Sequence, residues 1–300
     1  MTSFRSQQAL NQRKTWLLLG SMAALVAFVV YAAALYFGYV GIGIVPIAVG
    51  IALISIWGSY YSSDRIVLTM TGAKLISEED NPQLFNLVNE MCIASGLPMP
   101  KIAVVQDSAP NAFATGRNPE HALIAFTTGI LEKMDREQLQ GVVAHELAHV
   151  ANRDTLVSAI AATTAGALAL ISDLLIRMMW FGGNRRSGNN NSNPLVLIAA
   201  FLALILAPIA ATLLRSAISR KRESLADATA ISFTRNPTGL RRALETLAHD
   251  STVVRQKSTA VAHIWIESPL DHKAASKMFA THPPIQERIE LLRQMENGQL

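Results

Sequence analysis

Residues 145–149 read His-Glu-Leu-Ala-His, the pattern H-E-x-x-H, on a predicted helix. Because His145 and His149 are four positions apart, both imidazoles project from one helix face and can reach a single zinc ion. Glu146 then lies beside the metal, where its carboxylate can take a proton from zinc-bound water, whose pKa the metal lowers to about 7. With 7 His in 300 residues, about 0.007 such patterns are expected by chance before a helix is required. The alternative is a pair of helix-face histidines with an incidental Glu.

A third ligand must come from elsewhere in the chain. In the longer pattern H-E-x-x-H-x-x-G-x-x-H, a glycine ends the helix and a third histidine follows. Asn152 and Thr155 stand at those positions, which excludes that subclass. Two downstream carboxylates, Glu223 and Asp227, are four positions apart on a predicted helix, so one can bind a metal while the other orients a histidine N–H. The alternative is a solvated acidic face that neutralises the neighbouring basic residues. The full set of downstream candidates is Glu223, Asp227, Glu245, His249, His263, His272 and His282.

The composition indicates a membrane protein. Only 16% of the residues are charged and 50% are hydrophobic, with a mean hydropathy of +0.27, which excludes an intrinsically disordered chain. The single cysteine, Cys92, excludes an internal disulfide framework and a four-cysteine zinc site. The net charge is +4, but the densest basic runs all border apolar segments. They therefore indicate membrane-flanking anchors rather than a nucleic-acid surface.

The apolar residues are concentrated in two regions. Residues 15–63 include no formal charge, and this stretch is long enough for two membrane-spanning helices of about 20 residues each. We expect these helices at Trp16–Phe37 and Ile42–Tyr60; a cleaved signal peptide is the alternative explanation of the first run. The second region, Thr155–Leu214, is interrupted by the polar segment Gly182–Asn193 and predicts one or two further spans.

The basic residues predict the orientation in the membrane. Arg5, Arg13 and Lys14 precede the first span, whereas the turn after it carries no charge. The positive-inside rule therefore places the N-terminus and the body that begins after Tyr61 in the cytoplasm. The predicted parts are an anchor hairpin (1–62), a first catalytic part with the H-E-x-x-H helix (63–154), a hydrophobic hairpin (155–214) and a second catalytic part with the third zinc ligand (215–300).

The polar segments predict an α+β body. Runs of strand length occur at Lys101–Gln106 and Ala122–Thr127, with a short edge strand at Asn111–Gly116 between them. Asp135, followed three positions later by Gln138, is a capping-box signature for the helix that carries H-E-x-x-H. Further helices are expected at Pro82–Ala94 and Pro284–Met295, so the chain is mostly α-helical overall.

Five separated segments occur in one order along the chain: NAFATG (Asn111–Gly116), VAHELAHVANRD (Val143–Asp154), RESLADA (Arg222–Ala228), SFTRNP (Ser232–Pro237) and THPPIQERI (Thr281–Ile289). Together they resemble the HtpX family of bacterial membrane zinc metalloproteases and, more distantly, the CAAX prenyl proteases that share its catalytic core. The resemblance covers essentially the whole chain, including both hydrophobic regions, and it implies an α+β zincin-like (gluzincin) catalytic domain with transmembrane helical hairpins.

The resemblance also implies roles for individual residues. His145, His149 and Glu223 would be the ligands of one Zn²⁺ per chain, with Glu146 as the general base. Asp227 would orient a ligand histidine. Asn111, Ala112 and Phe113 would form an edge strand that pairs with substrate backbone. His282 and Arg288 would lie at the cleft and stabilise the oxyanion or hold the site together. The alternatives are that His282 simply precedes a helix and that Arg288 forms a surface salt bridge.

The expected function is that of a membrane-anchored zinc metalloendopeptidase, a hydrolase. Its catalytic domain would face the cytoplasm from a multi-pass anchor in the bacterial cytoplasmic (inner) membrane. The resemblance alone implies a role in stress response and protein quality control, in which misfolded membrane or cytosolic proteins are cleaved. The expected partners are protein or peptide substrates and the lipid bilayer, with no nucleic acid.

Three other functions fit parts of the sequence. A catalytically inert, zinc-stabilised scaffold or holdase would not need Glu146. An intramembrane metalloprotease would place its metal within the bilayer, yet the polar residues Asn152, Arg153 and Asp154 follow the histidines. A CAAX-type protease acting on prenylated C-termini is expected to have more spans than this chain has.

Overall fold

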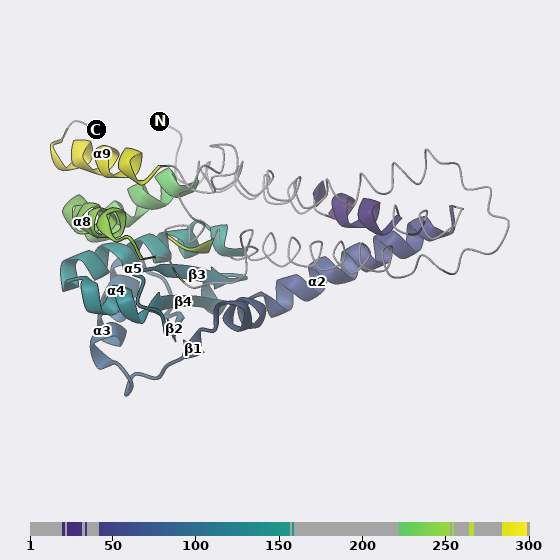
Figure 1. The fold of residues 1–300 in the computed structure, drawn as a ribbon, viewed down its shortest axis with the longest axis horizontal. Helices are drawn as coiled ribbons and strands as arrows, with labels where there is room; N and C mark the ends of the chain where they lie inside the picture. The colour runs from purple at the N-terminus through teal and green to yellow at the C-terminus, as the bar shows by residue number, and fades with distance from the viewer. Residues whose placement is uncertain are drawn as a thin grey trace. The chain divides into compact units, whose positions relative to one another are not determined.

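The computed structural model describes residues 20–21, 23–31, 34, 42–156, 158, 222–252, 254, 264–266 and 284–298 (Figure 1). The chain divides into two units, Met1–Tyr60 with Ile160–Leu214 and Tyr61–Ala159 with Arg215–Leu300. The hydrophobic region Thr155–Leu214 and the span expected at Trp16–Phe37 lie largely outside the described residues, as does His282 entirely.

The described part of the first unit is helical. Residues 23–31 are helical, and helix α2 extends over Ile44–Thr71. The span expected at Ile42–Tyr60 falls on α2, but the helix continues through Asp64 and Arg65 and ends at Gly72, whose φ is +68°. None of the helices in the described ranges is both long enough and apolar enough to cross a bilayer. Large apolar side chains nevertheless lie exposed along α2: Val45, Ile47, Val49, Ile51, Leu53, Ile54 and Trp57.

A four-stranded sheet organises the second unit. Its strands are β1 (Lys74–Leu75), β2 (Lys101–Val105), β3 (Ala112–Gly116) and β4 (Ala122–Thr127), in the spatial order β1-β2-β4-β3. Strands β2 and β4 are parallel, and the other two pairings are antiparallel. The predicted strands therefore form with nearly the predicted bounds, and β3 is an edge strand. The two-residue strand β1 was not predicted, because a pair of residues carries no periodicity.

Alternate residues of β3 enter different cores, as the two-residue period of a strand requires. Ala112 and Ala114 belong to the cluster that includes helix α5 (Arg136–Ala151), whereas Phe113 packs with Val67 and Trp265 in the cluster on the other side. The small alanine side chains let the backbone of α5 lie close to the sheet. The H-E-x-x-H helix is thereby held against the edge strand.

Side chains cap the N-termini of several described helices. Asp135 and Gln138 form the predicted capping box at the start of α5, since each accepts a hydrogen bond from the other's backbone N–H at 2.9 Å. Asn81 caps helix α3 (Pro82–Ser95), whose buried stripe includes Cys92. The described residues also form α4 (Thr128–Lys133), a 3₁₀ turn (Pro119–His121), the helical residues 222–234, α8 (Pro237–His249) and α9 (Ile285–Glu296).

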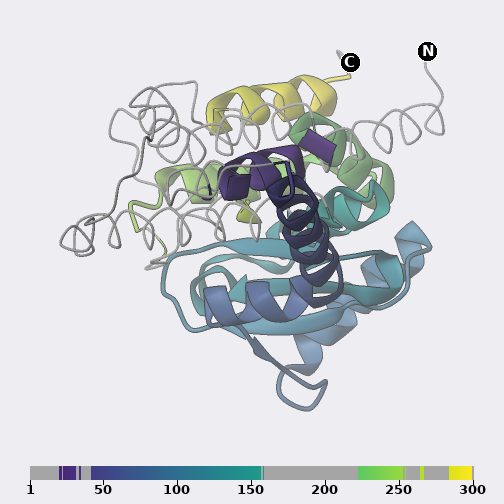
Figure 2. The same ribbon diagram turned by 90° about the vertical axis from the view of Figure 1, so that its right-hand side faces the viewer.

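These helices form layers over one face of the sheet. Helix α8 packs on α5, and α9 packs on α8 (Figures 1 and 2). The contact between α5 and α8 is close at Gly141, where a Cβ atom would lie 2.5 Å from the backbone nitrogen of Leu240. Glycine at this position therefore sets the distance between the two helices.

We predict that Gly141→Ala lowers the free energy of unfolding by about 1–3 kcal/mol, because backbone atoms of α8 must move to admit the methyl group. The measurement is chemical denaturation of the purified full chain in detergent. Gly50→Ala in α2 is the control, since a Cβ there meets nothing within 4 Å, and it is expected to leave stability unchanged or raised by up to about 1 kcal/mol. Equal stabilities for wild type and Gly141→Ala would contradict this account of the helix contact.

Candidate metal centre and active site

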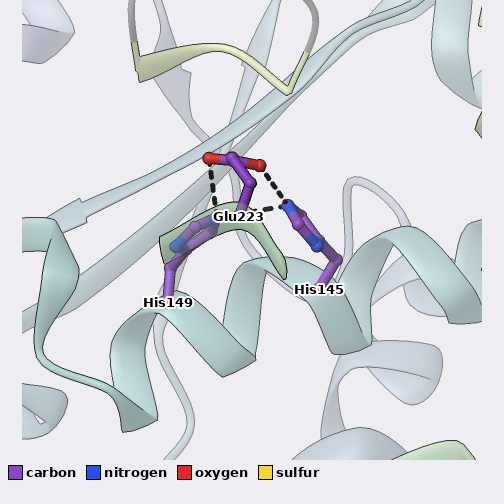
Figure 3. A group of neighbouring side chains, drawn as sticks. All are labelled: His145, His149 and Glu223. Atoms are coloured by element: carbon purple, nitrogen blue, oxygen red, sulfur yellow. Dashed lines mark hydrogen bonds and ion pairs between the residues drawn. The ribbon is translucent and has the colours of Figure 1, made fainter. Parts of the chain in front are cut away.

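Three side chains from two helical segments converge on one point (Figure 3). Helix α5 contributes His145 and His149, and the helical segment that begins at residue 222 contributes Glu223. The two Nε2 atoms are 3.1 Å apart. His145 Nε2 lies 3.5 Å from Glu223 Oε2, and His149 Nε2 lies 3.6 Å from Glu223 Oε1. The structure thus brings together the histidine pair and one of the carboxylates that the sequence left open.

The spacing of these atoms fits a tetrahedral metal ion. Zinc bonds of about 2.0–2.1 Å to nitrogen and oxygen place neighbouring ligand atoms about 3.3–3.4 Å apart. The two Nε2 atoms are 3.1 Å apart, and each lies 3.5 or 3.6 Å from one of the two Glu223 oxygens, which is close to that value. One ligand atom from each residue lies within 4.8 Å of the other two, so the three residues have the donor types for zinc and lie close enough together to bind one ion.

The hydrogen bonds of the two imidazoles support the same conclusion. His145 Nδ1 lies 3.0 Å from Asp227 Oδ1, and His149 Nδ1 lies 3.3 Å from Asp154 Oδ2. A carboxylate beside Nδ1 fixes the proton there, so that both Nε2 lone pairs point at the same place. If both Nε2 atoms were unprotonated, their lone pairs would repel each other, so this arrangement favours a positive charge between them, either a proton or a metal ion.

Asp154 was not singled out from the sequence. It follows the end of α5, where Arg153 has a φ of +59° and turns the chain back towards His149. In the sequence, Asn152, Arg153 and Asp154 indicate only a polar boundary. The available signal is a carboxylate shortly after the H-E-x-x-H helix, but the positive φ of Arg153, which directs that carboxylate to the histidine, is not evident from the residue types.

Arg288 on α9 is buried against the metal-binding group. Its Nε and Nη2 atoms donate to the two oxygens of Asp227 at 2.9 and 2.6 Å, and Nη1 lies 3.4 Å from Glu223 Oε2. Only 3% of its side chain is exposed, so the alternative of a surface salt bridge is wrong. The acidic-face alternative for Glu223 and Asp227 is wrong for the same reason, because both are buried.

The buried charges change the acidity of their neighbours. Burial by itself raises the pKa of Asp227, but the charge of Arg288 and the hydrogen bond with His145 hold it at about 2. Burial lowers the pKa of His145, but the hydrogen bonds with Asp227 and Glu223 outweigh this effect and raise it to about 9. These surroundings favour a positive charge at the His145 ring, whether a proton or a metal ion.

Glu146 lines a cavity beside this group. The cavity is also lined by Ala114, His149, Asp154, Thr155, Ser158, Arg222, Glu223 and Ile264–Ile266. Only 2% of Glu146 is exposed. Burial raises the pKa of its carboxyl group, while positive charge on His145 and His149 opposes the increase. A carboxyl group with a raised pKa can accept a proton and later return it.

The expected substrate strand lies at the edge of the sheet, and part of its outer edge is occupied. Ile266 N–H donates to Ala112 O at 2.9 Å, and Phe113 forms an antiparallel bridge with Trp265. The Trp265 ring is fully buried and packs edge-on against Phe113. Ala114, the next residue whose side chain faces α5, lines the cavity. Asn111 is buried directly before the strand.

The other candidate ligands that the structure describes have partners outside the site. Glu245 on α8 pairs with Arg241 and Arg293 at the surface, and the exposed His249 Nδ1 hydrogen-bonds to the Glu245 carbonyl. His263, His272 and His282 lie outside the described residues.

The sheet, the H-E-x-x-H helix and a glutamate from a later helix define a metallopeptidase. Residues 78–296 match peptidase family M48. Many relatives carry the description "Protease HtpX homolog". The one from Streptococcus gordonii is 44% identical over 96% of this chain and 99% of its own length. The one from Syntrophobacter fumaroxidans is 45% identical over 91% of this chain and 96% of its own length. The chain therefore belongs to peptidase family M48 and, within it, to the HtpX proteases.

This membership confirms the resemblance found in the sequence and the prediction of a metalloprotease, a hydrolase. A further relative, from Thermoanaerobacter pseudethanolicus, is 42% identical over 96% of both chains. Among solved structures, the crystal structure of S. mikatae Ste24p aligns with a TM-score of 0.49 and 17% identity, covering 93% of this chain and 66% of that one.

We predict that Arg288→Gln lowers the free energy of unfolding by about 3–5 kcal/mol, because Asp227 would remain buried without its cation. Arg293→Gln on the same helix is the matched control. Its side chain is 51% exposed and pairs only at the surface, so the loss should be at most about 1 kcal/mol. Denaturation of both variants beside wild type makes the comparison, and similar losses for the two would refute the buried role of Arg288.

Proposed function

We propose that the chain is a membrane-anchored zinc endopeptidase in which His145, His149 and Glu223 hold the metal. The observation that carries this proposal is the convergence of those ligand atoms beside the cavity that Glu146, His149 and Glu223 line. A zinc ion held there would act as a Lewis acid and lower the pKa of a bound water. The zincin-like (gluzincin) form of the site is part of the proposal.

Glu146 would act as the general base and then as the general acid. Its carboxylate would take the proton of the attacking water and later deliver a proton to the leaving amine. The raised pKa of Glu146 supports the second step, because burial favours the protonated form from which the proton is donated. An inert scaffold has no use for a buried carboxyl group beside the metal.

Asp227 and Arg288 would hold the site in place. Asp227 would orient His145 through Nδ1, and Arg288 would neutralise Asp227 and Glu223. Since the Arg288 guanidinium is engaged with these two carboxylates, we propose that it positions the ligands rather than stabilises the oxyanion. For His282 we retain the proposal of a cleft residue.

Peptide substrates would meet the chain at the edge of the sheet. Main-chain pairing with an edge strand ignores most side chains, so it suits the cleavage of many misfolded proteins. Because Ala112 and Phe113 already pair with Ile266 and Trp265, we propose that a peptide enters beside Ala114. Asn111, Ala112 and Phe113 would then position that edge next to the metal.

The membrane anchor remains a proposal supported by the sequence and by exposed apolar residues. The parts proposed are 1–62 and 155–214 as hydrophobic hairpins, and 63–154 with 215–300 as the catalytic domain. Exposed apolar patches of this kind are covered by a partner or by lipid, and the apolar side chains along α2 favour lipid. We propose a multi-pass protein of the bacterial cytoplasmic membrane whose catalytic part faces the cytoplasm and removes misfolded membrane or cytosolic proteins.

We predict that Glu146→Gln retains zinc but loses at least about 100-fold in the cleavage of casein, because the amide cannot accept a proton. The measurement is zinc content and casein hydrolysis of the purified full chain in detergent, wild type beside variant. Unchanged cleavage would show that Glu146 is not the base, and loss of zinc would mean that the variant tests the metal site instead.

We predict that Glu223→Ala loses its zinc, because two histidines alone leave the site without its third ligand and without a charge to balance the ion. Zinc content after dialysis against a weak chelator makes the measurement. Glu245→Ala is the control, since that carboxylate lies at the surface on α8 with Arg241, and it should retain zinc as wild type does. Full retention by Glu223→Ala would point to another third ligand.

A further inference from the structure

The two ligand histidines are held in different ways. His145 is completely enclosed, and the side chains packed around it restrict its ring. His149 borders the cavity with 16% of its side chain exposed. Packing alone therefore restricts the ring of His149 less than that of His145. A hydrogen bond to the ring has a larger effect on the orientation of His149.

Asp154 supplies that hydrogen bond. Its Oδ2 atom lies 3.3 Å from His149 Nδ1, and only 4% of its side chain is exposed. The neighbouring backbone is fixed on both sides. Arg153 N–H donates to Val150 O at 3.1 Å, and Thr155 Oγ1 donates to Gly116 O of the edge strand at 2.9 Å. The carboxylate is therefore presented from an ordered turn.

Arg222 connects Asp154 to the third ligand. Its Nη1 atom donates to the Asp154 carbonyl oxygen at 3.3 Å and lies 3.9 Å from Asp154 Oδ1. Only 13% of the Arg222 side chain is exposed, and the residue directly precedes Glu223. One arginine thus joins the turn after α5 to the helical segment that supplies the carboxylate ligand.

The same order of groups occurs at the other histidine. There Arg288 bonds Asp227, and Asp227 bonds His145 Nδ1. The Arg288–Asp227 contacts are 2.6 and 2.9 Å, shorter than the 3.3 and 3.9 Å from Arg222 to Asp154. The group at His149 is therefore the looser of the two, and it is the one that lines the cavity.

We propose that Asp154, held by Arg222, is a positioning residue for the metal site: it keeps the proton of His149 on Nδ1 and directs the Nε2 lone pair at the metal. This inference rests on the proposed function, because it takes His149 to be a ligand. Without Asp154, His149 could rotate towards the cavity or carry its proton on Nε2, and neither state binds a metal. Partners of this kind typically contribute about 10–100-fold to metal affinity.

The test is zinc affinity, measured by competition with a chromophoric chelator, for the full chain in detergent. Asp154→Ala is expected to weaken zinc binding by about 10–100-fold. Asp154→Asn keeps the shape and an oxygen that can accept the Nδ1–H, so its affinity should lie between those of Asp154→Ala and wild type. Asp250→Ala is the control, because Asp250 pairs with Lys133 at the far end of α8, and it should bind zinc as wild type does.

Two further measurements separate positioning from general destabilisation. Cobalt substituted for zinc should show an altered d–d absorption spectrum in Asp154→Asn, which keeps the size of the side chain. Arg222→Gln should weaken zinc binding in the wild-type background but add little to Asp154→Ala, because both changes act through the same contact. Additive effects would exclude the link through Arg222.

The outcomes distinguish this inference from the proposed function. Zinc affinity within twofold of wild type in both Asp154 variants would overturn the inference, even if cleavage were lost. If the wild-type chain binds no zinc at all, the proposed function itself fails. If wild type binds zinc and Glu146→Gln stops cleavage while both Asp154 variants bind normally, only the role of Asp154 is lost.

Discussion

The structure of this protease depends on placing several charged side chains inside the protein and neutralising each of them. Removing a carboxylate or a guanidinium from water is costly unless a partner of opposite charge and hydrogen bonds replace the solvent. Around His145, Arg288 lies between Asp227 and Glu223, and the histidine ring completes the group. The helices that meet here are restricted to one relative orientation, because a shift of about one ångström would leave a buried charge without its partner. The pairing of buried charges therefore determines the geometry of the site together with the packing of the helices.

Small residues allow the helices to come close enough to satisfy this requirement. Ala112 and Ala114 of β3 let α5 approach the sheet, and Gly141 lets α8 approach α5. Helix α9 then packs on α8 (Figure 1). From α9, Arg288 donates to Asp227 and contacts the His145 ring. A chain of close backbone contacts therefore links the edge of the sheet to the arginine, and the metal-binding atoms lie along it.

Local features of the sequence were sufficient for much of this description. The capping box at Asp135, the runs that became β2 and β4, and the i, i+4 spacing of the histidines are all written in short stretches of chain. The features that escaped prediction depend on an unusual local turn or on a contact between distant segments. Asp154 meets His149 only because Arg153 turns the chain, and Trp265 meets Phe113 across some 150 positions. Helix α2 continues beyond Tyr60, the predicted end of the span, because no glycine or proline occurs between Tyr60 and Gly72.

The separation of the site residues along the chain has a consequence for synthesis. The histidines lie near residue 145, the carboxylates follow at 223 and 227, and Arg288 comes about 60 residues after Asp227. A growing polypeptide thus exposes its histidine pair long before the glutamate and the neutralising arginine have been translated. The proposed metal site therefore cannot be complete in a nascent chain until Glu223 and Arg288 have both left the ribosome.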